Sequence, residues 1–219
     1  MSRNRDLDPE TLLRAYAYGI FPMAQDRNDT TLYWMDPDPR GILPLDKFHI
    51  PKRLARTVRA DLYTVRVDTA FTRVMEACAE PTDERRSTWI NDRILGLYSA
   101  LFEQGYAHSV ETWEGEALVG GLYGVSVGAA FFGESMFSRK RDASKVALVH
   151  LLGRLLTGGY QLLDTQYTTS HLSQFGVIEI PRKDYRRQLR RAVAMKADFY
   201  SLPAEADGAL VMQSVSHTS

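Results

Sequence analysis

Hydrophobic residues recur along this chain with two different periods. Apolar positions three and four residues apart share one face of a helix, whereas alternating positions or short apolar runs between turn residues are typical of strands. The first pattern predicts helices over residues 8–19, 50–60, 70–79, 91–104, 143–157 and 182–197. The second predicts strands over residues 63–68, 107–113, 117–125, 129–132 and 160–166.

The order of these elements predicts a mixed α/β protein. A hairpin precedes a strand–helix–strand crossover, which together favour a mixed sheet covered by helices. Residues 19–45 contain four prolines, at 22, 37, 39 and 44, and this excludes long regular elements there. We therefore expect a small irregular N-terminal domain over residues 1–45 and a main domain over 46–219. Residues 201–219 show no periodicity and are predicted to form a loose tail.

The amino-acid composition excludes several kinds of function for this chain. The 219 residues include 27 Lys plus Arg and 27 Asp plus Glu, so the formal net charge is zero and a polyanion site must be a local patch. The one cysteine, Cys78, excludes a disulfide framework within the chain and a zinc site with several cysteines. Residues 1–6 are polar with no apolar segment behind them, and no apolar run approaches the ~20 residues of a membrane helix. The expectation is a cytoplasmic protein without a membrane partner.

The segment 118–145 combines glycine-rich strands with one acidic residue. Glycine costs backbone entropy in a strand, so its use there indicates that something approaches the backbone closely. Glu134 lies among Phe131, Phe132 and Phe137, where an ionised carboxylate is costly without a partner. We interpret Glu134 as a residue reserved for a cation or an amine.

Asp164 and Gln166 form a second polar group within an apolar strand. Two residues apart, they are expected to point to the same face. A carboxylate and an amide held in this way could accept hydrogen bonds from an incoming amine, as acyl transfer to nitrogen requires. The alternative is that Asp164 caps a loop and Gln166 satisfies backbone groups.

Basic side chains gather in segments that could hold phosphate groups. The predicted helix 182–197 carries two adjacent columns, and a loop before the helix 143–157 carries further cations beside its N-terminus. These residues are Arg182, Lys183, Arg186, Arg187, Arg190 and Arg191 in the helix and Arg139, Lys140, Arg141 and Lys145 near the loop. The helix 50–60 is basic as well. A phosphate backbone would suit these segments if they share one face; the alternatives are a solvated loop and pairing with the protein's own acids.

Other familiar chemistry lacks its sequence signals. The chain has no HExxH motif and no paired cysteines, so we expect no metal site, and His108 and His171 are interpreted as structural. Ser135 and Ser138 do not lie in a G-x-S-x-G turn, and Cys78 lies in an ordinary helix, which argues against a covalent nucleophile.

Short segments in a fixed order resemble the motifs of the leucyl/phenylalanyl-tRNA–protein transferase family. They are RAYAYGIFPM, YWMDPDPRGILP, STWI, AHSVETW, LVGGLYGV, FFGESMFS, ASK and LLDTQYTTSHLSQFG, between about Leu12 and Tyr185. The resemblance implies an enzyme that moves Leu or Phe, and less readily Met, from aminoacyl-tRNA to proteins beginning with Arg or Lys. It also implies N-degron proteolysis of the product, no cofactor, and a main domain with the acetyltransferase-like GNAT fold.

The resemblance assigns roles to individual residues. The family's catalytic Asp and Gln correspond to Asp164 and Gln166, and its pocket Glu corresponds to Glu134. The substrate pocket would include Trp89, Leu122, Leu151, Leu155, Leu163 and Met23. Leu151 and Leu155 stand where some members have aromatics, and Met23 stands where many have Trp.

Two other functions compete with this interpretation. A coenzyme A-dependent acetyltransferase of the same fold usually carries a glycine-rich pyrophosphate loop, but this chain has no G-x-G. A noncatalytic RNA-binding module would use the basic segments but would leave Glu134, Asp164 and Gln166 unexplained.

Overall fold

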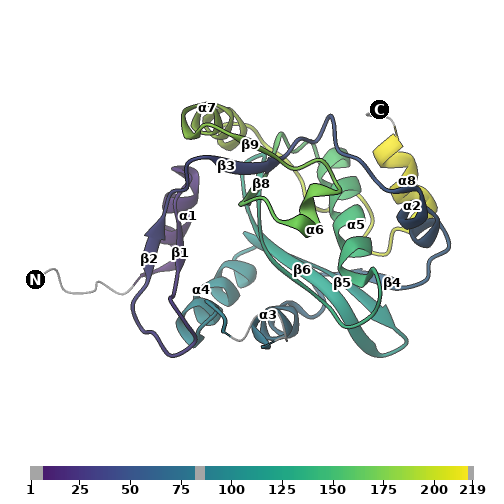
Figure 1. Cartoon of the computed structure of the whole chain (residues 1–219), viewed down its shortest axis with the longest axis horizontal. Helices are drawn as coiled ribbons and strands as arrows, with labels where there is room; N and C mark the ends of the chain where they lie inside the picture. Colours follow the sequence, from purple (N-terminus) through teal and green to yellow (C-terminus); the bar gives the residue numbers. More distant parts are fainter. Residues whose placement is uncertain (1–6, 82–86, 217–219) are drawn as a thin grey trace, which may run out of the picture.

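A seven-stranded mixed sheet forms the centre of the computed structural model, which describes residues 7–81 and 87–216 (Figure 1). The strand order is β4-β5-β6-β7-β8-β3-β9, and every neighbouring pair is antiparallel except β7 and β8. The strands are β3 (Arg40–Leu43), β4 (Thr64–Val67), β5 (Ala107–Glu114), β6 (Ala117–Val127), β7 (Ala130–Ser138), β8 (Leu162–Gln166) and β9 (Ile178–Ile180). A separate hairpin pairs β1 (Phe21–Met23) with β2 (Tyr33–Met35). The predicted mixed α/β class is confirmed.

Helices cover both faces of the sheet. Neighbouring strand residues face different cores: Phe131 and Leu163 pack in one, Phe132 and Leu162 in the other. The first core is covered by α2 (Lys52–Arg59), α5 (Ala143–Thr157) and α8 (Gly208–Ser216). The second is covered by α1 (Pro9–Ala17), α3 (Phe71–Ala79), α4 (Asp92–Glu103) and α7 (Arg182–Val193). A short helix, α6 (Ser170–Ser173), follows β8. No described helix combines the length and apolar character needed to cross a bilayer.

Helix α5 is the central support of the first core. Most of its 15 residues are buried, including the polar Ser144, His150 and Arg154. A helix that is apolar on most sides is buried by neighbours on most sides, and here α5 lies between the sheet and the pair α2 and α8 (Figure 1).

The C-terminal segment is ordered, so the prediction of a loose tail from about residue 201 is wrong. Residues Gly208–Ser216 form α8, whose Val211, Met212 and Val215 are buried in the first core. Arg154 holds the segment that leads to α8 by donating to the carbonyls of Phe199 and Pro203. The helix was missed because it has no charged residue to mark a polar face.

Two further features differ from the sequence-based expectation. β7 continues to Ser138, six residues past its predicted end, because the segment 133–138 pairs with β6. β3 was not predicted and pairs with both β8 and β9. A boundary at residue 45 would assign β3 to the N-terminal domain, although β3 lies within the large sheet. The division into two domains stays a prediction.

The close approach of α8 to α2 can be tested with glycine substitutions. A Cβ added at Gly208 would lie 1.9 Å from the carbonyl oxygen of Val58. We expect Gly208→Ala to lower the free energy of unfolding by about 1–3 kcal/mol, the range for overpacking. Gly96→Ala is the control, because a Cβ there meets no atom within 4 Å and alanine favours a helix by up to about 1 kcal/mol. Urea unfolding of both variants checks this; equal effects would contradict the α8 docking.

Candidate active site

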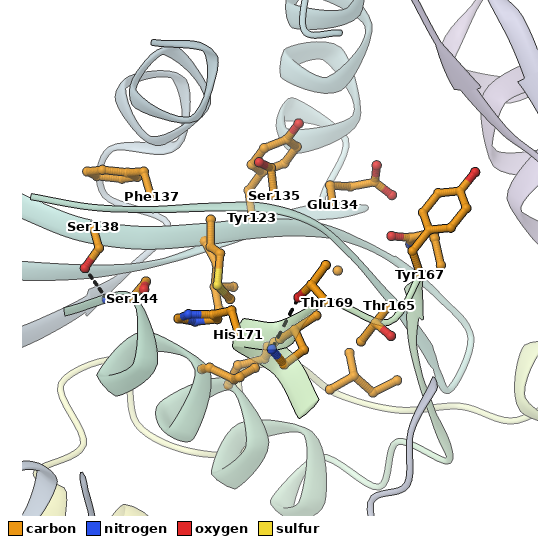
Figure 2. Close-up of a pocket in the computed structure, with 18 residues that line it drawn as sticks. Tyr123, Glu134, Ser135, Phe137, Ser138, Ser144, Thr165, Tyr167, Thr169 and His171 are labelled. Atoms are coloured by element: carbon orange, nitrogen blue, oxygen red, sulfur yellow. Dashed lines mark hydrogen bonds between the residues drawn. The ribbon is translucent and has the colours of Figure 1, made fainter. Parts of the chain in front are cut away.

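A cavity opens where the two parallel strands separate. β8 pairs with β7 only at Ala130, Phe131 and Phe132, and from Gly133 onward β7 runs on without it. The space between them is about 470 Å³. Apolar and polar side chains both line it, and His171 lies between Ser138 and Ser144 on one side and Glu134 and Tyr167 on the other (Figure 2). The apolar wall is formed by Leu122, Met136, Leu148, Leu151, Leu163 and Leu172.

Glu134 reaches this cavity because of a β-bulge. In the pairing of β6 with β7, Tyr123 faces Ser135 and Gly124 faces Gly133, so Glu134 is the extra residue. A bulge re-aims side chains and bends the strand. The carboxylate accepts hydrogen bonds from the hydroxyls of Tyr16 (2.7 Å) and Tyr98 (3.3 Å), and the two hydroxyls also contact each other. Two helices distant in sequence, α1 with Tyr16 and α4 with Tyr98, therefore fix the position of Glu134.

The surroundings of Glu134 bring its pKa close to neutral pH. Burial, and to a smaller degree the nearby charge of Asp164, raises the pKa of Glu134 from its ordinary 4.5 to about 7, while the hydrogen bond from Tyr16 opposes the shift. At neutral pH the carboxyl group can therefore exist in either form. An amino group arriving beside it would favour the ionised form.

Asp164 is paired with an arginine rather than exposed to the cavity. Its carboxylate is fully buried and accepts two hydrogen bonds from Arg40, from Nε at 3.0 Å and from Nη2 at 2.7 Å. The hydroxyl of Tyr185 donates a third, at 2.5 Å. Arg40 also donates to the carbonyl of Gly19 and lies over the rings of Phe21 and Tyr185. The expectation that Asp164 and Gln166 point to one face is therefore wrong: Gln166 lines the cavity and Asp164 does not.

A strained turn gives Gln166 this separate direction. Gln166 has φ +56°, in the left-handed region that non-glycine residues rarely adopt, and Tyr167 N–H donates to the carbonyl of Thr165 across it at 2.6 Å. Asp164 Oδ1 accepts from the backbone N–H of Gln166 at 2.8 Å. Gly41 of β3 is needed beside the turn, since a Cβ there would lie 2.7 Å from the carbonyl carbon of Tyr167. The ion pair thus holds a turn that presents Gln166.

Buried polar atoms without a partner concentrate in this cavity. Among the described residues, Thr165 Oγ1, Gln166 Nε2 and His171 Nε2 are buried and have no hydrogen-bond partner, and all three side chains line the cavity. An unsatisfied buried polar atom costs about 1–3 kcal/mol. Such a group of atoms is typical of a site completed by a ligand or by water.

The structure brings together some of the predicted pocket residues. Glu134, Leu122, Leu151, Leu163 and Gln166 all line the cavity. Three others are placed elsewhere: Leu155 is buried in the first core, one turn along α5, while Met23 and Trp89 pack against the second core. Their roles stay predictions.

The predicted basic residues occupy two separate regions. α7 ends at Val193, whose carbonyl oxygen would lie 2.4 Å from a Cβ at Gly128, just before β7 begins. The Arg139–Lys145 segment follows the other end of β7, about 30 Å along that strand. A single continuous patch over both regions is therefore not formed.

Many of these cations are paired with the protein's own acids. Arg182 and Arg186 contact Asp36, and Arg187 contacts Asp184. The pairs at the other region are Arg139 with Glu80, Lys140 with Glu114, and both Arg141 and Lys145 with Asp142. Within the described chain, Lys183, Arg190 and Arg191 have no ion pair.

Sequence reasoning missed the residues that complete the site. Tyr16, Tyr98, Arg40 and Tyr185 hold Glu134 and Asp164, yet none was singled out. The available signal was indirect: a buried carboxylate in an apolar strand requires a partner, but Arg40 lies 124 positions from Asp164. His171 was interpreted as structural, whereas it lines the cavity. The described residues contain no cluster of His, Cys, Asp and Glu suited to a metal.

The raised pKa of Glu134 predicts a pH-dependent stability. Between pH 4.5 and about 7 the folded state binds more protons than the unfolded chain, so stability falls as pH rises through this range. Glu134→Gln mimics the neutral form and should be more stable than wild type at pH 8, by up to about 3 kcal/mol. Urea unfolding at pH 5 and pH 8 measures this. The control Glu103→Gln, at an exposed residue, should retain the pH dependence of wild-type stability. If Glu134→Gln also retained that pH dependence, Glu134 would not be the residue that causes it.

The buried ion pair predicts a large effect on stability. Arg40→Met leaves an uncompensated carboxylate at Asp164 and should lower the free energy of unfolding by about 3–5 kcal/mol. Adding Asp164→Asn removes that charge and should recover part of the loss. Arg14→Ala, which breaks the exposed pair with Glu10, serves as the control and should cost less than about 1 kcal/mol. Denaturant titration of the variants tests this; equal losses for Arg40→Met and Arg14→Ala would contradict it.

Comparison with known proteins identifies the family. The model of the leucyl/phenylalanyl-tRNA protein transferase family matches residues 42–190, and the model of its N-terminal domain matches residues 5–38. A leucyl/phenylalanyl-tRNA–protein transferase of Caulobacter vibrioides is 60% identical over 210 residues, covering 96% of this chain and 97% of the relative. That of Maricaulis maris is 56% identical over 215 residues, covering 98% and 100%. The chain therefore belongs to the leucyl/phenylalanyl-tRNA–protein transferase family.

Proposed function

We propose that this enzyme transfers leucyl or phenylalanyl groups, and less readily methionyl groups, from aminoacyl-tRNA to the α-amine of proteins that begin with Arg or Lys. The observation that carries this is one cavity in which an apolar wall adjoins Glu134 and Gln166. The wall suits an apolar side chain, and the two polar groups suit the amines of the reaction. The product would then be a substrate for N-degron proteolysis in the cytoplasm.

The reaction joins an amine to an ester carbonyl. The α-amine of the acceptor attacks the carbonyl carbon of the aminoacyl group, a C–N bond forms, and the bond to the terminal ribose oxygen breaks. The proton lost by the amine ends on the ribose hydroxyl. Because the ester supplies the driving force, neither ATP nor a cofactor is expected.

Gln166 is the residue that meets the reacting groups in this proposal. Its amide oxygen can accept a hydrogen bond from the attacking amine, and its Nε2, which has no partner among the described residues, can donate to the carbonyl oxygen as charge develops there. A neutral amide does not retain a proton, so Gln166 orients the amine rather than deprotonating it. Such alignment can lower the barrier by several kcal/mol.

Asp164 and Glu134 have different roles. Asp164 acts through the backbone of Gln166, since its oxygens already accept from Arg40, Tyr185 and the Gln166 N–H. Glu134 borders the cavity directly, and its ionised form binds the amino group of the donor or the acceptor. The bulged position of Glu134 supports this role.

The tRNA would be held by the basic regions outside the cavity. One region consists of Arg139, Lys140, Arg141 and Lys145. The ion pair of Arg53 in α2 with Asp142, at 3.0 Å, connects this region to α2. It adjoins the cavity because Ser144, beside Lys145, lines it. The other region is α7, where Lys183, Arg190 and Arg191 are available to phosphate groups.

A GNAT-like main domain is part of this proposal, and a mixed sheet with helices on both faces supports it. Acetyl transfer from coenzyme A, the activity of acetyltransferases with that fold, is the second candidate. The region before α5 lacks the glycine-rich loop that would take a pyrophosphate. Aminoacyl transfer is therefore the better supported function.

Loss of the Gln166 side chain should remove transfer without removing RNA binding. Gln166→Ala is expected to lower the transfer rate about 100-fold or more, the range for one aligned polar group at a reacting carbonyl. The assay uses labelled leucyl-tRNA and a peptide beginning with Arg. Gln161→Ala, an exposed glutamine just before β8, is the matched control. Transfer that survives in Gln166→Ala, or that depends on acetyl-CoA and resists ribonuclease, would refute the proposal.

The contribution of α7 to tRNA binding can be separated from the effect of net charge. Replacing Lys183, Arg190 and Arg191 by Ala should weaken tRNA binding. It should also make the slope of log K against the logarithm of salt concentration shallower by about two to three, since each lost phosphate contact removes about 0.9 from that slope. Replacing Arg182, Arg186 and Arg187 removes the same charge from side chains already paired with acids, and should change the slope less. Filter binding across salt concentrations measures both. Identical slopes in the two triple variants would exclude specific phosphate contacts by α7.

A further inference from the structure

A second, smaller pocket lies between the end of α1 and α7, which contact each other on one face of the sheet (Figure 1). It measures about 300 Å³ and shares no residue with the cavity between β7 and β8. Its lining residues are Ala17, Tyr18, Ile20, Arg186, Leu189 and Arg190. The three aliphatic residues are buried or half-buried, whereas the tyrosine and both arginines are exposed.

The end of α1 holds the backbone that carries Tyr18. Gly19 has φ +81°, in the left-handed region that favours glycine. The N–H groups of Gly19 and Ile20 donate back to carbonyls of α1 at 2.8 and 2.9 Å, which ends the helix in a Schellman motif. The Gly19 carbonyl in turn accepts from Arg40 at 2.9 Å. Tyr18 therefore extends from a fixed turn, although it is itself 73% exposed.

The two arginines of this pocket differ in their charge balance. Arg186 forms an ion pair with Asp36. Arg190, one turn further along α7, forms no ion pair with any described residue. A guanidinium group binds phosphate oxygens and also stacks on planar rings. The pocket thus combines an apolar surface, an exposed aromatic ring and a cation that is free to bind an anion.

We propose that this pocket binds one unstacked nucleotide of the tRNA, with its base on the ring of Tyr18 and a phosphate at Arg190. A cavity of ~150 Å³ holds a benzene ring, so about 300 Å³ accommodates a base of two rings. Unpaired RNA bases are commonly bound by stacking on aromatic side chains and arginines. The inference rests on the proposed function, in which α7 contacts the phosphate groups of the tRNA.

The charge distribution along α7 favours RNA over an acidic peptide as the occupant. Lys183 and Arg190 both lack ion pairs with described residues, and seven helical positions place them about 10 Å apart along one side of α7. Arg191 adds a third such cation. A phosphate backbone carries a charge at every nucleotide and can meet cations spread over this length. A peptide would need acidic side chains at matching positions beside the one that fills the pocket.

Substitutions of Tyr18 separate stacking from charge. In filter binding with deacylated phenylalanine tRNA, Tyr18→Ala should raise Kd about tenfold, within the range for one base stacked on an aromatic side chain. The slope of log K against the logarithm of salt concentration should not change, because a tyrosine ring releases no counterions. Tyr18→Trp should bind like wild type. Tyr106→Ala, at an exposed tyrosine outside the pocket, is the matched control and should also bind like wild type.

Arg190→Ala should give the complementary result. Its Kd should rise and its slope should become shallower by about 0.7–0.9, the value for one phosphate contact. Wild-type affinity in Tyr18→Ala would overturn the inference, even if Arg190→Ala behaves as expected. If Tyr18→Ala instead slowed transfer to a folded acceptor protein but not to a short peptide, the pocket would bind protein rather than RNA. Failure of the wild-type enzyme to bind tRNA would overturn the proposed function itself.

A photocrosslinker at the same position identifies the nucleotide. Tyr18 is replaced by 4-azidophenylalanine, the complex with tRNA is irradiated, and the crosslinked nucleotide is mapped by primer extension. We expect one principal crosslink, at a nucleotide outside the base-paired stems, and none when Tyr106 is replaced in the same way. Crosslinks confined to base-paired nucleotides, or equally strong from both positions, would contradict binding of an unstacked base in this pocket.

Discussion

The buried pair of Arg40 and Asp164 is the interaction on which the rest of the site depends. A carboxylate inside an apolar core is stable only if its charge is compensated and its oxygens are hydrogen-bonded. Arg40 meets both requirements and connects β3 to β8, while its contacts to Gly19 and Tyr185 bring in the end of α1 and the start of α7. One ion pair therefore joins segments from both ends of the chain around the turn at Gln166.

The parallel pairing of β7 and β8 turns this support into a site. Because the strands pair over only three residues, their continuations are free to separate and leave a cavity. Glu134 enters from the bulge of β7 and Gln166 from the turn after β8, so two local irregularities supply the polar groups. Regular strands would have left the same positions paired with each other.

Periodicity predicted the helices and the long strands because each carries enough residues to show its period. It did not predict β3, whose four residues lie in a proline-rich segment, or α8, whose uncharged sequence lacks a polar face. The residue pattern singled out Glu134, Asp164 and Gln166 as candidates, and the family resemblance assigned roles to the same three residues. The apolar surroundings of Glu134 also indicated that its carboxylate needs a partner. Neither the pattern nor the resemblance could identify Arg40 or Tyr16 as partners, because such pairings depend on tertiary packing across 124 and 118 positions. Tertiary packing likewise decides which arginines pair with nearby acids, so the sequence did not predict these ion pairs.

A double-mutant cycle on Arg40 and Gln166 tests the central claim that the ion pair acts on transfer through Gln166. Arg40→Lys keeps the positive charge but loses the two-pronged contact with Asp164, and its effect on single-turnover transfer is measured with and without Gln166→Ala. If the ion pair serves to hold Gln166, Arg40→Lys slows transfer about tenfold in wild type and very little in Gln166→Ala. The same slowing in both backgrounds would show that Arg40 and Gln166 act independently, and would contradict the account.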